Sequence, residues 1–211
     1  MVFIANFATF HSQAIVTVFS NCERVRLTQN GKAIATQAPD AGFHLPYPPF
    51  IFKVGDFSGT RSMLFANNVA PLGTEIGQLL AEGFIGDKVV ATHLVHSPGV
   101  PASMQLQVDT RGIDLVADGA DWVRVYAHIC DERGTTYPYS DDVVTFSVSG
   151  EGALIGDGRI FANPLRAEAG IATALVRTTR IAGPITVRAA SPGLKEAEIT
   201  FASKDDWKSL A

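Results

Sequence analysis

Cysteine is scarce in this sequence, which contains only Cys22 and Cys130, far apart along the chain. A disulfide framework needs several cysteines and a structural zinc site brings its ligands in closely spaced pairs, so the sequence predicts neither. The sequence leaves open a single disulfide bridge between these two distant cysteines. The five histidines form no HExxH or similar motif, and no GxSxG elbow occurs, so we predict no metal centre, no cofactor and no serine hydrolase site.

Charge and long apolar runs are also limited. Charged residues make up 18% of the chain, the net charge is −4 and no block of Lys and Arg occurs, which argues against a nucleic-acid partner. No apolar run approaches the roughly 20 residues that cross a bilayer, so we expect no membrane span. The N-terminal MVFIANFATFHS lacks the basic start and the cleavage site of a signal peptide. Either the protein is cytoplasmic or the chain begins inside a longer polypeptide, and the localisation stays unknown.

Short β-type runs separated by turn residues dominate the sequence. Trp122–Cys130 alternates apolar and polar positions with the period of two that is typical of a strand burying one face. Asn30 and Gly31, between two such runs, predict a type I′ hairpin turn because both tolerate positive φ. With 46% hydrophobic residues and no convincing amphipathic helix, the pattern predicts an all-β chain built as β-sandwiches.

One proline- and glycine-rich stretch, His96–Pro101, interrupts this pattern and is typical of a linker. We therefore predict a first domain over residues 1–98, a second over 99–204 and a tail over 205–211. Residues 56–78 mix Gly, Ser, Asn and Pro with apolar side chains. They are predicted to form a long loop that packs on a neighbour, since loops of this length are unusual inside compact domains.

Several stretches resemble a known family. VTVFSNCERVRLTQNGK, which begins at Val16, resembles a strand pair in the penultimate immunoglobulin-like domain of family 2 glycoside hydrolases, the β-galactosidase-like enzymes. PPFIFKV and LLAEGFIGDKVVATHLVHSPGVPASMQLQVD are similar to the rest of that domain and the crossing into the next. LVADGADWVRVYAHICDERGTTYPYSDDVVTFSVSGEGALIGDG resembles the final immunoglobulin-like domain of the same family. The resemblance implies two consecutive immunoglobulin-like β-sandwich domains.

The resemblance also implies what the chain does not do. In that family the catalytic glutamates lie on a central (β/α)₈ barrel, and this chain has no repeating strand–helix units that could build one. We therefore expect a non-catalytic C-terminal region that supports domain packing or oligomer contacts, and not an enzyme by itself. The expected partners are the barrel and sandwich domains of a parent enzyme, together with a homodimer contact or a carbohydrate. The alternative is a carbohydrate-binding or adhesin-like binding module.

Five residues are the candidate interface or sugar contacts, and none is predicted to be catalytic. They are Tyr137, Tyr139, Asp157, Arg159 and Phe161. Aromatic rings stack on the flat apolar faces of sugars, although a Tyr in a sandwich more often packs in the core or at an edge. The glycine-flanked Asp157 is typical of a tight turn, which either serves the fold alone or approaches a neighbouring domain.

Other polar groups favour structural roles. The aspartates at positions 114, 118, 121, 141 and 142 could supply calcium ligands, but their spacing matches no EF-hand and acidic residues are common in turns. Trp122 and Tyr126 are further aromatic side chains that could stack on a sugar. Cys22 follows a strand and has neither the partner His nor the basic site of a catalytic thiol, so it is predicted to be a small reduced packing residue.

Overall fold

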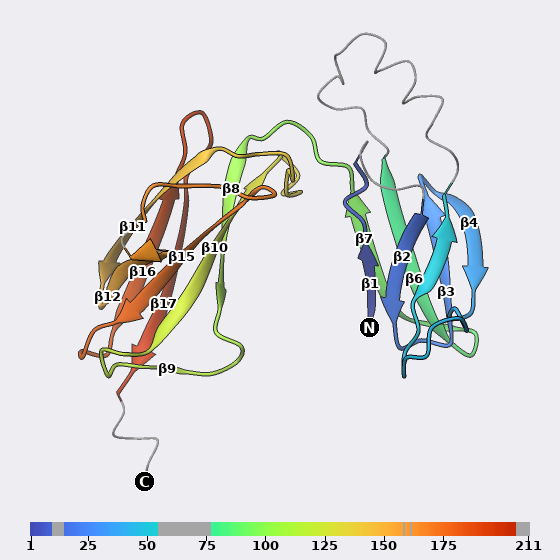
Figure 1. Cartoon of the computed structure of the whole chain (residues 1–211), viewed down its shortest axis with the longest axis horizontal. Helices are drawn as coiled ribbons and strands as arrows, with labels where there is room; N and C mark the ends of the chain where they lie inside the picture. The colour runs from blue at the N-terminus through green and yellow to red at the C-terminus, as the bar shows by residue number, and fades with distance from the viewer. Residues whose placement is uncertain (10–14, 55–76, 158, 161, 206–211) are drawn as a thin grey trace. The chain divides into compact units, whose positions relative to one another are not determined.

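The computed structural model of the chain describes residues 1–9, 15–54, 77–157, 159–160 and 162–205 (Figure 1). Every regular element in these ranges is a β-strand, which confirms the all-β prediction. The chain divides into two compact units, Met1–Gly99 and Val100–Ala211. Each unit is a β-sandwich of two mainly antiparallel sheets, as the immunoglobulin-like prediction requires.

The first unit pairs a three-stranded sheet, in the order β1-β2-β5, with a four-stranded sheet, in the order β4-β3-β6-β7. The strands are β1 Val2–Ala5, β2 Ile15–Ser20, β3 Arg24–Gln29, β4 Lys32–Gln37, β5 Phe50–Lys53, β6 Gln78–Ile85 and β7 Lys88–His96. Asn30 and Gly31 join β3 to β4 with φ values of 51° and 78°, so the predicted type I′ geometry is confirmed.

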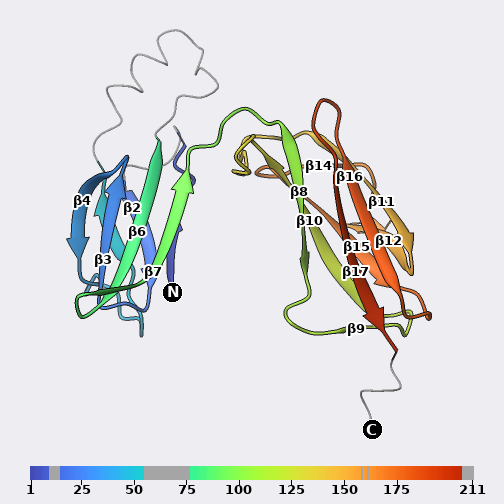
Figure 2. The ribbon, with the colours of Figure 1, turned by 180° about the vertical axis from the view of Figure 1, so that it is seen from behind.

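The second unit contains two five-stranded sheets, in the orders β13-β12-β15-β10-β8 and β14-β11-β16-β17-β9. Figure 2 shows these strands from behind. They are β8 Ser103–Asp109, β9 Leu115–Val116, β10 Trp122–Cys130, β11 Val143–Gly150, β12 Gly152–Asp157, β13 Arg159–Ile160, β14 Leu165–Arg166, β15 Ile171–Thr178, β16 Pro184–Ala190 and β17 Ala197–Lys204.

Strand alternation decides which side chains enter each core. On β10 the residues Val123, Val125, Ala127 and Ile129 are buried, while the residues between them face outward. The same period of two runs through β15, whose alternate positions pack on the opposite sheet. Burial of the apolar residues at alternate positions turns the residues between them to the outside of the sheet, so the sequence pattern also determines which side chains form the outer face.

The structure also sets bounds that the sequence does not. Strand β1 ends at Ala5, and the backbone of Ala8 has a φ of 49° that a strand does not allow. The strands β9, β13 and β14 were not predicted, since two-residue strands leave little periodicity to detect, and neither was the six-residue strand β12. Most of the predicted 56–78 loop and the tail beyond Asp205 lie outside the described residues.

Candidate functional site

The two predicted tyrosines contact each other. Tyr137 and Tyr139 lie in the turn that follows β10, with ring centroids 5.6 Å apart in an edge-on arrangement. The backbone N–H of Tyr137 donates to the carbonyl oxygen of Ile129, which anchors the turn on the strand. Burial raises the pKa of Tyr137, while Tyr139 is 45% exposed. Tyr137 is therefore partly buried, and Tyr139 is the ring of the pair that is exposed to a partner.

A buried carboxylate holds the turn that carries these tyrosines. Asp131 is 3% exposed, and its Oδ1 accepts hydrogen bonds from the backbone N–H groups of Arg133 and Thr135, each at 2.9 Å. The guanidinium of Arg133 lies 3.3 Å from Oδ2 of the same residue. A carboxylate that accepts several N–H groups satisfies donors that a tight turn would leave unpaired. Asp131 therefore has a structural role.

Of the remaining predicted residues, Asp157 and Arg159 lie at the hairpin of β12 and β13. Asp157 ends β12 and pairs in register with Arg159. Its carboxylate lies 3.9 Å from the guanidinium of Arg124, which comes from β10 two strands away in the sheet. For Arg159 only the backbone is described, and Phe161 lies outside the described residues. Asp157 is thus a member of the outer face of the sheet as well as a turn residue.

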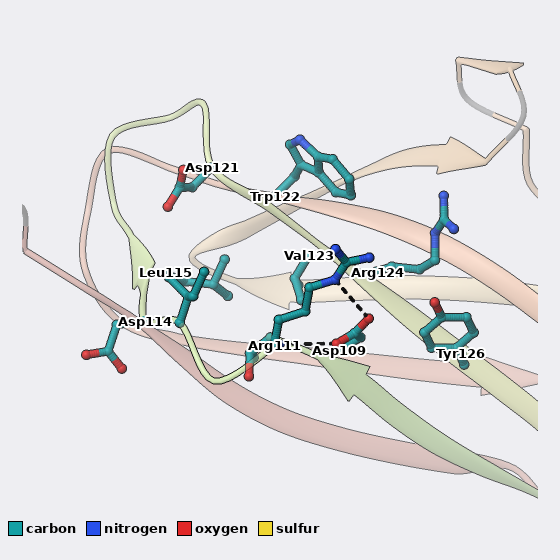
Figure 3. Close-up of a pocket in the computed structure, with 11 residues that line it drawn as sticks. Asp109, Arg111, Asp114, Leu115, Asp121, Trp122, Val123, Arg124 and Tyr126 are labelled. Atoms are coloured by element: carbon teal, nitrogen blue, oxygen red, sulfur yellow. Dashed lines mark hydrogen bonds and ion pairs between the residues drawn. The ribbon is translucent and has the colours of Figure 1, made fainter. Parts of the chain in front are cut away.

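A hollow of about 340 Å³ lies beside that outer face, where β8 ends and β10 begins. Its main polar and aromatic side chains are Asp109, Arg111, Trp122, Arg124 and Tyr126 (Figure 3). The sequence analysis had weighed Trp122 and Tyr126 as sugar platforms but had not connected them with Asp109 or Arg111. Only the antiparallel pairing of β10 with β8, which sets Arg124 opposite Asp109, brings these residues together.

The first unit has an apolar outer face that the sequence analysis missed. Phe3, Ile15 and Phe19 are 48%, 46% and 42% exposed, although they lie within strands of the three-stranded sheet. Phe3 stands directly opposite Phe19 in the register of β1 and β2. We call these three residues and Ile51 of β5 the unit 1 apolar face. Its signal was available: β1 and β5 are apolar at successive positions, as in strands covered on both faces.

The opposite sheet of the same unit has a different outer face. Arg26 pairs with Glu82 at 2.7 Å, and the guanidinium groups of Arg24 and Arg26 lie over the ring of Phe84. The hydrogen bond and charge of Glu82 raise the pKa of Arg26. This part of the sheet is charged and internally paired, although Ile85, Val89, Val90 and Leu94 of β6 and β7 are also exposed. On the unit 1 apolar face two Phe rings stand opposite each other across a strand pair, as is typical of a surface that a partner covers.

Both cysteines are free and buried. Burial is the main cause that raises the pKa of Cys130, which disfavours its thiolate. Cys22 is 5% exposed in the core of the first unit, and its Sγ faces Gly83 of β6. A Cβ added to Gly83 would lie 2.6 Å from that sulfur and 2.5 Å from Cγ2 of Val2. Cys22 is therefore a packing residue at a place where β1 and β6 approach closely, as predicted.

The described ranges contain no cluster of three or more His, Cys, Asp or Glu side chains arranged to hold a metal ion. Asp118 instead accepts the backbone N–H groups of Ala120 and Asp121, at 2.7 and 2.8 Å, and these bonds lower its pKa. In the same described part of the chain, no helix is long and apolar enough to cross a membrane.

Comparison with known proteins places these units in context. Residues 104–200 match the family described as glycoside hydrolase family 2 C-terminal domain 5. The chain is 37% identical to a β-galactosidase of Thermoanaerobacter pseudethanolicus over 176 residues, which cover 82% of the chain and 22% of the relative. It is 30% identical to a β-glucuronidase of Formosa agariphila over 194 residues, which cover 88% of the chain and 17% of the relative.

Solved structures agree with these matches. A β-glucuronidase from glycoside hydrolase family 2 superposes with a TM-score of 0.65 at 27% identity, covering 97% of this chain and 20% of that one. A β-glycosidase from Bacteroides vulgatus, at 19% identity and a TM-score of 0.66, shares the fold. The chain spans about a fifth of the length of the curated relatives it matches. Residues 104–200 therefore belong to the C-terminal domain 5 family of glycoside hydrolase family 2, and the chain resembles the C-terminal immunoglobulin-like domains of β-galactosidase-like enzymes.

Proposed function

We propose that the chain is a non-catalytic structural region of a larger family 2 enzyme that hydrolyses O-glycosidic bonds. In this role the unit 1 apolar face packs against another domain of the same polypeptide. The observation that carries the proposal is the unit 1 apolar face itself, where Phe3 stands opposite Phe19 and three large apolar side chains are about half exposed on one sheet. The small share of each relative that the chain covers supports it, since that share leaves room for a separate catalytic domain.

The energetics favour a covered face. Burial of apolar surface contributes about 25 cal/mol per Å², so three half-exposed Phe and Ile side chains on one sheet leave a substantial stabilisation unused. Proteins that stand alone rarely keep large apolar side chains adjacent on a flat sheet, because such patches promote association. Phe3 and Phe19 are neighbours across the strand pair and form the centre of the contact.

The first test is catalytic. The isolated 211-residue chain is assayed with chromogenic β-galactoside and β-glucuronide substrates, after circular dichroism has shown that it is folded. We expect no hydrolysis above a heat-denatured control. Turnover that follows the purified chain would refute the non-catalytic role.

The second test concerns the face itself. Phe19→Cys places a thiol on the unit 1 apolar face, and Leu94→Cys places a matched control on β7, where Leu94 is 47% exposed. We expect a maleimide to label both thiols in the isolated chain, and to label position 19 much more slowly in the longer polypeptide that contains the chain. Equal labelling in both contexts would contradict domain packing. Protection that develops in the isolated chain as its concentration rises would instead identify a homodimer contact and also contradict it.

A further inference from the structure

The hollow of Figure 3 combines an exposed aromatic ring with polar groups from three elements. Trp122, Arg124 and Tyr126 follow one another at alternate positions of β10, so they share the outer face of the sheet. Trp122 is 55% exposed, and its indole ring lies at the rim of the hollow (Figure 3). A volume of about 340 Å³ is within the range of small-ligand sites, about 300–1,000 Å³.

Arg124 has an unmet hydrogen-bonding requirement at this place. Its Nε is buried and has no hydrogen-bond partner among the described residues, while its guanidinium end lies 3.9 Å from Asp157. Buried donors are nearly always paired in folded proteins, so an orphan donor calls for an explanation. The side chain of Arg124 is 42% exposed and its contact with Asp157 is long, so N–H groups at its guanidinium end can donate to a ligand hydroxyl.

The opposite wall is preorganised. Asp109 accepts the backbone N–H of Arg111 at 3.1 Å, and its second oxygen lies 3.7 Å from the Arg111 guanidinium, which reaches over the turn (Figure 3). Oγ1 of Thr178 lies 3.0 and 3.2 Å from the carbonyl oxygens of Val116 and Asp121, which share its single proton, and this contact fixes the segment that leads into Trp122. Groups that are already held in place lose little conformational freedom when a ligand binds.

The charges around the hollow select the class of ligand. Arg111 pairs with Asp109, Arg124 with Asp157, and Lys204 with Asp114 at 2.5 Å. Each of these three cations is matched by a carboxylate, so none of the three favours an acidic sugar, a phosphate or a sulfate over a neutral ligand. The carboxylates can instead accept hydrogen bonds from sugar hydroxyl groups, and the guanidinium groups can donate to them. The exposed indole of Trp122 offers an apolar face to a pyranose ring.

We propose that this hollow on the second unit binds a neutral saccharide, with Trp122 as the stacking platform and Arg124 and Asp109 as the hydroxyl-binding groups. The site is distinct from the unit 1 apolar face and goes beyond the structural role, so either proposal can fail without the other. Tyr137 and Tyr139, the predicted sugar contacts, do not line this hollow.

The experiment is affinity electrophoresis of the folded 211-residue chain in gels that contain β-1,4-galactan, xyloglucan, mixed-linkage β-glucan or polygalacturonate. We expect retardation by at least one of the three neutral polysaccharides. Trp122→Ala should weaken that retardation about tenfold, the order of magnitude of one aromatic stacking contact, while Trp122→Phe should keep most of it. Tyr139→Ala is the matched control, because it removes an exposed ring outside the hollow and should leave retardation unchanged.

The variants also separate binding from folding. Arg124→Met keeps the apolar stem of the side chain and removes its donors, so it should weaken retardation while the thermal unfolding transition stays close to that of the unmodified chain. Migration unaffected by all three neutral polysaccharides would overturn the proposal. So would retardation by polygalacturonate alone, or retardation that survives Trp122→Ala.

Discussion

Gly83 offers the sharpest test of how the first unit is packed. A methyl group at this position would stand 2.6 Å from Sγ of Cys22 and 2.5 Å from Cγ2 of Val2, well inside van der Waals contact. Both neighbours are buried, at 5% and 8% exposure, so neither can move into solvent without loss. Overpacking of this kind costs about 1–3 kcal/mol. Gly83→Ala should therefore lower the free energy of unfolding of the first unit by about that amount.

The effect of Gly83→Ala on the free energy of unfolding should change when the clash is removed. The φ of Gly83 is not in the left-handed region, so alanine can adopt its backbone conformation. Where no clash exists, Gly→Ala stabilises by about 0.4–1 kcal/mol, because it restricts the unfolded chain. In a Val2→Ala, Cys22→Ala background only Cβ of residue 22 stays close to the added methyl group, at 3.3 Å, so Gly83→Ala should destabilise much less than in the wild-type chain. The double-mutant cycle should give a coupling energy of about 1–4 kcal/mol between position 83 and its two neighbours.

Two optical probes can separate the units in one urea titration. Residues 1–99 contain no tryptophan and Trp122 lies on β10 of the second unit, so a change in tryptophan fluorescence does not arise from a tryptophan of the first unit. Far-UV circular dichroism reports on the strands of both units. We expect Gly83→Ala to shift the circular dichroism transition of the first unit and to leave the fluorescence transition in place. The packing argument would be refuted if Gly83→Ala changed the free energy of unfolding by the same amount in the wild-type chain and in the Val2→Ala, Cys22→Ala background.

Three further predictions concern the second unit and the thiols. Asp131→Ala removes the charged acceptor of two part-buried backbone N–H groups, each bond being worth about 1.5–3 kcal/mol. Fluorescence-detected unfolding should therefore show a loss of about 3–6 kcal/mol, and Asp131→Asn about half as much. Burial lowers the pKa of His128 below its ordinary value of about 6.5, so the unfolded state binds more protons between the lowered pKa and 6.5. The stability of the second unit should be full above about pH 6.5 and should fall as the pH drops through that window; a slope unchanged by His128→Gln would contradict this. Cys22 and Cys130 should react with Ellman's reagent slowly in the native chain and at once in urea, and a fast native thiol would show that one of them is accessible.

Much of the fold could be predicted because its determinants are local. The alternation in Trp122–Cys130 shows which side chains a strand buries, and Asn30-Gly31 can satisfy a turn that needs two positive φ values. The two-residue strands β9 and β14 could not be predicted, since their ladders depend on partners elsewhere in the chain. β9, for example, pairs in parallel with the end of β17.

The sequence by itself determined the class of structure, the faces of the longer strands and the resemblance to family 2 enzymes. These properties follow from residue period, turn chemistry and motifs that are contiguous in the chain. Only the tertiary structure decided which outward side chains meet. Sheet order sets Phe3 opposite Phe19, Arg124 opposite Asp109 and Gly83 against Cys22. Pairing over such separations depends on how strands are arranged in a sheet, which a local pattern does not encode. The apolar runs of β1 and β5 were a local signal of the unit 1 apolar face, but which residues meet there, and the hollow on the second unit, became visible only in the folded chain.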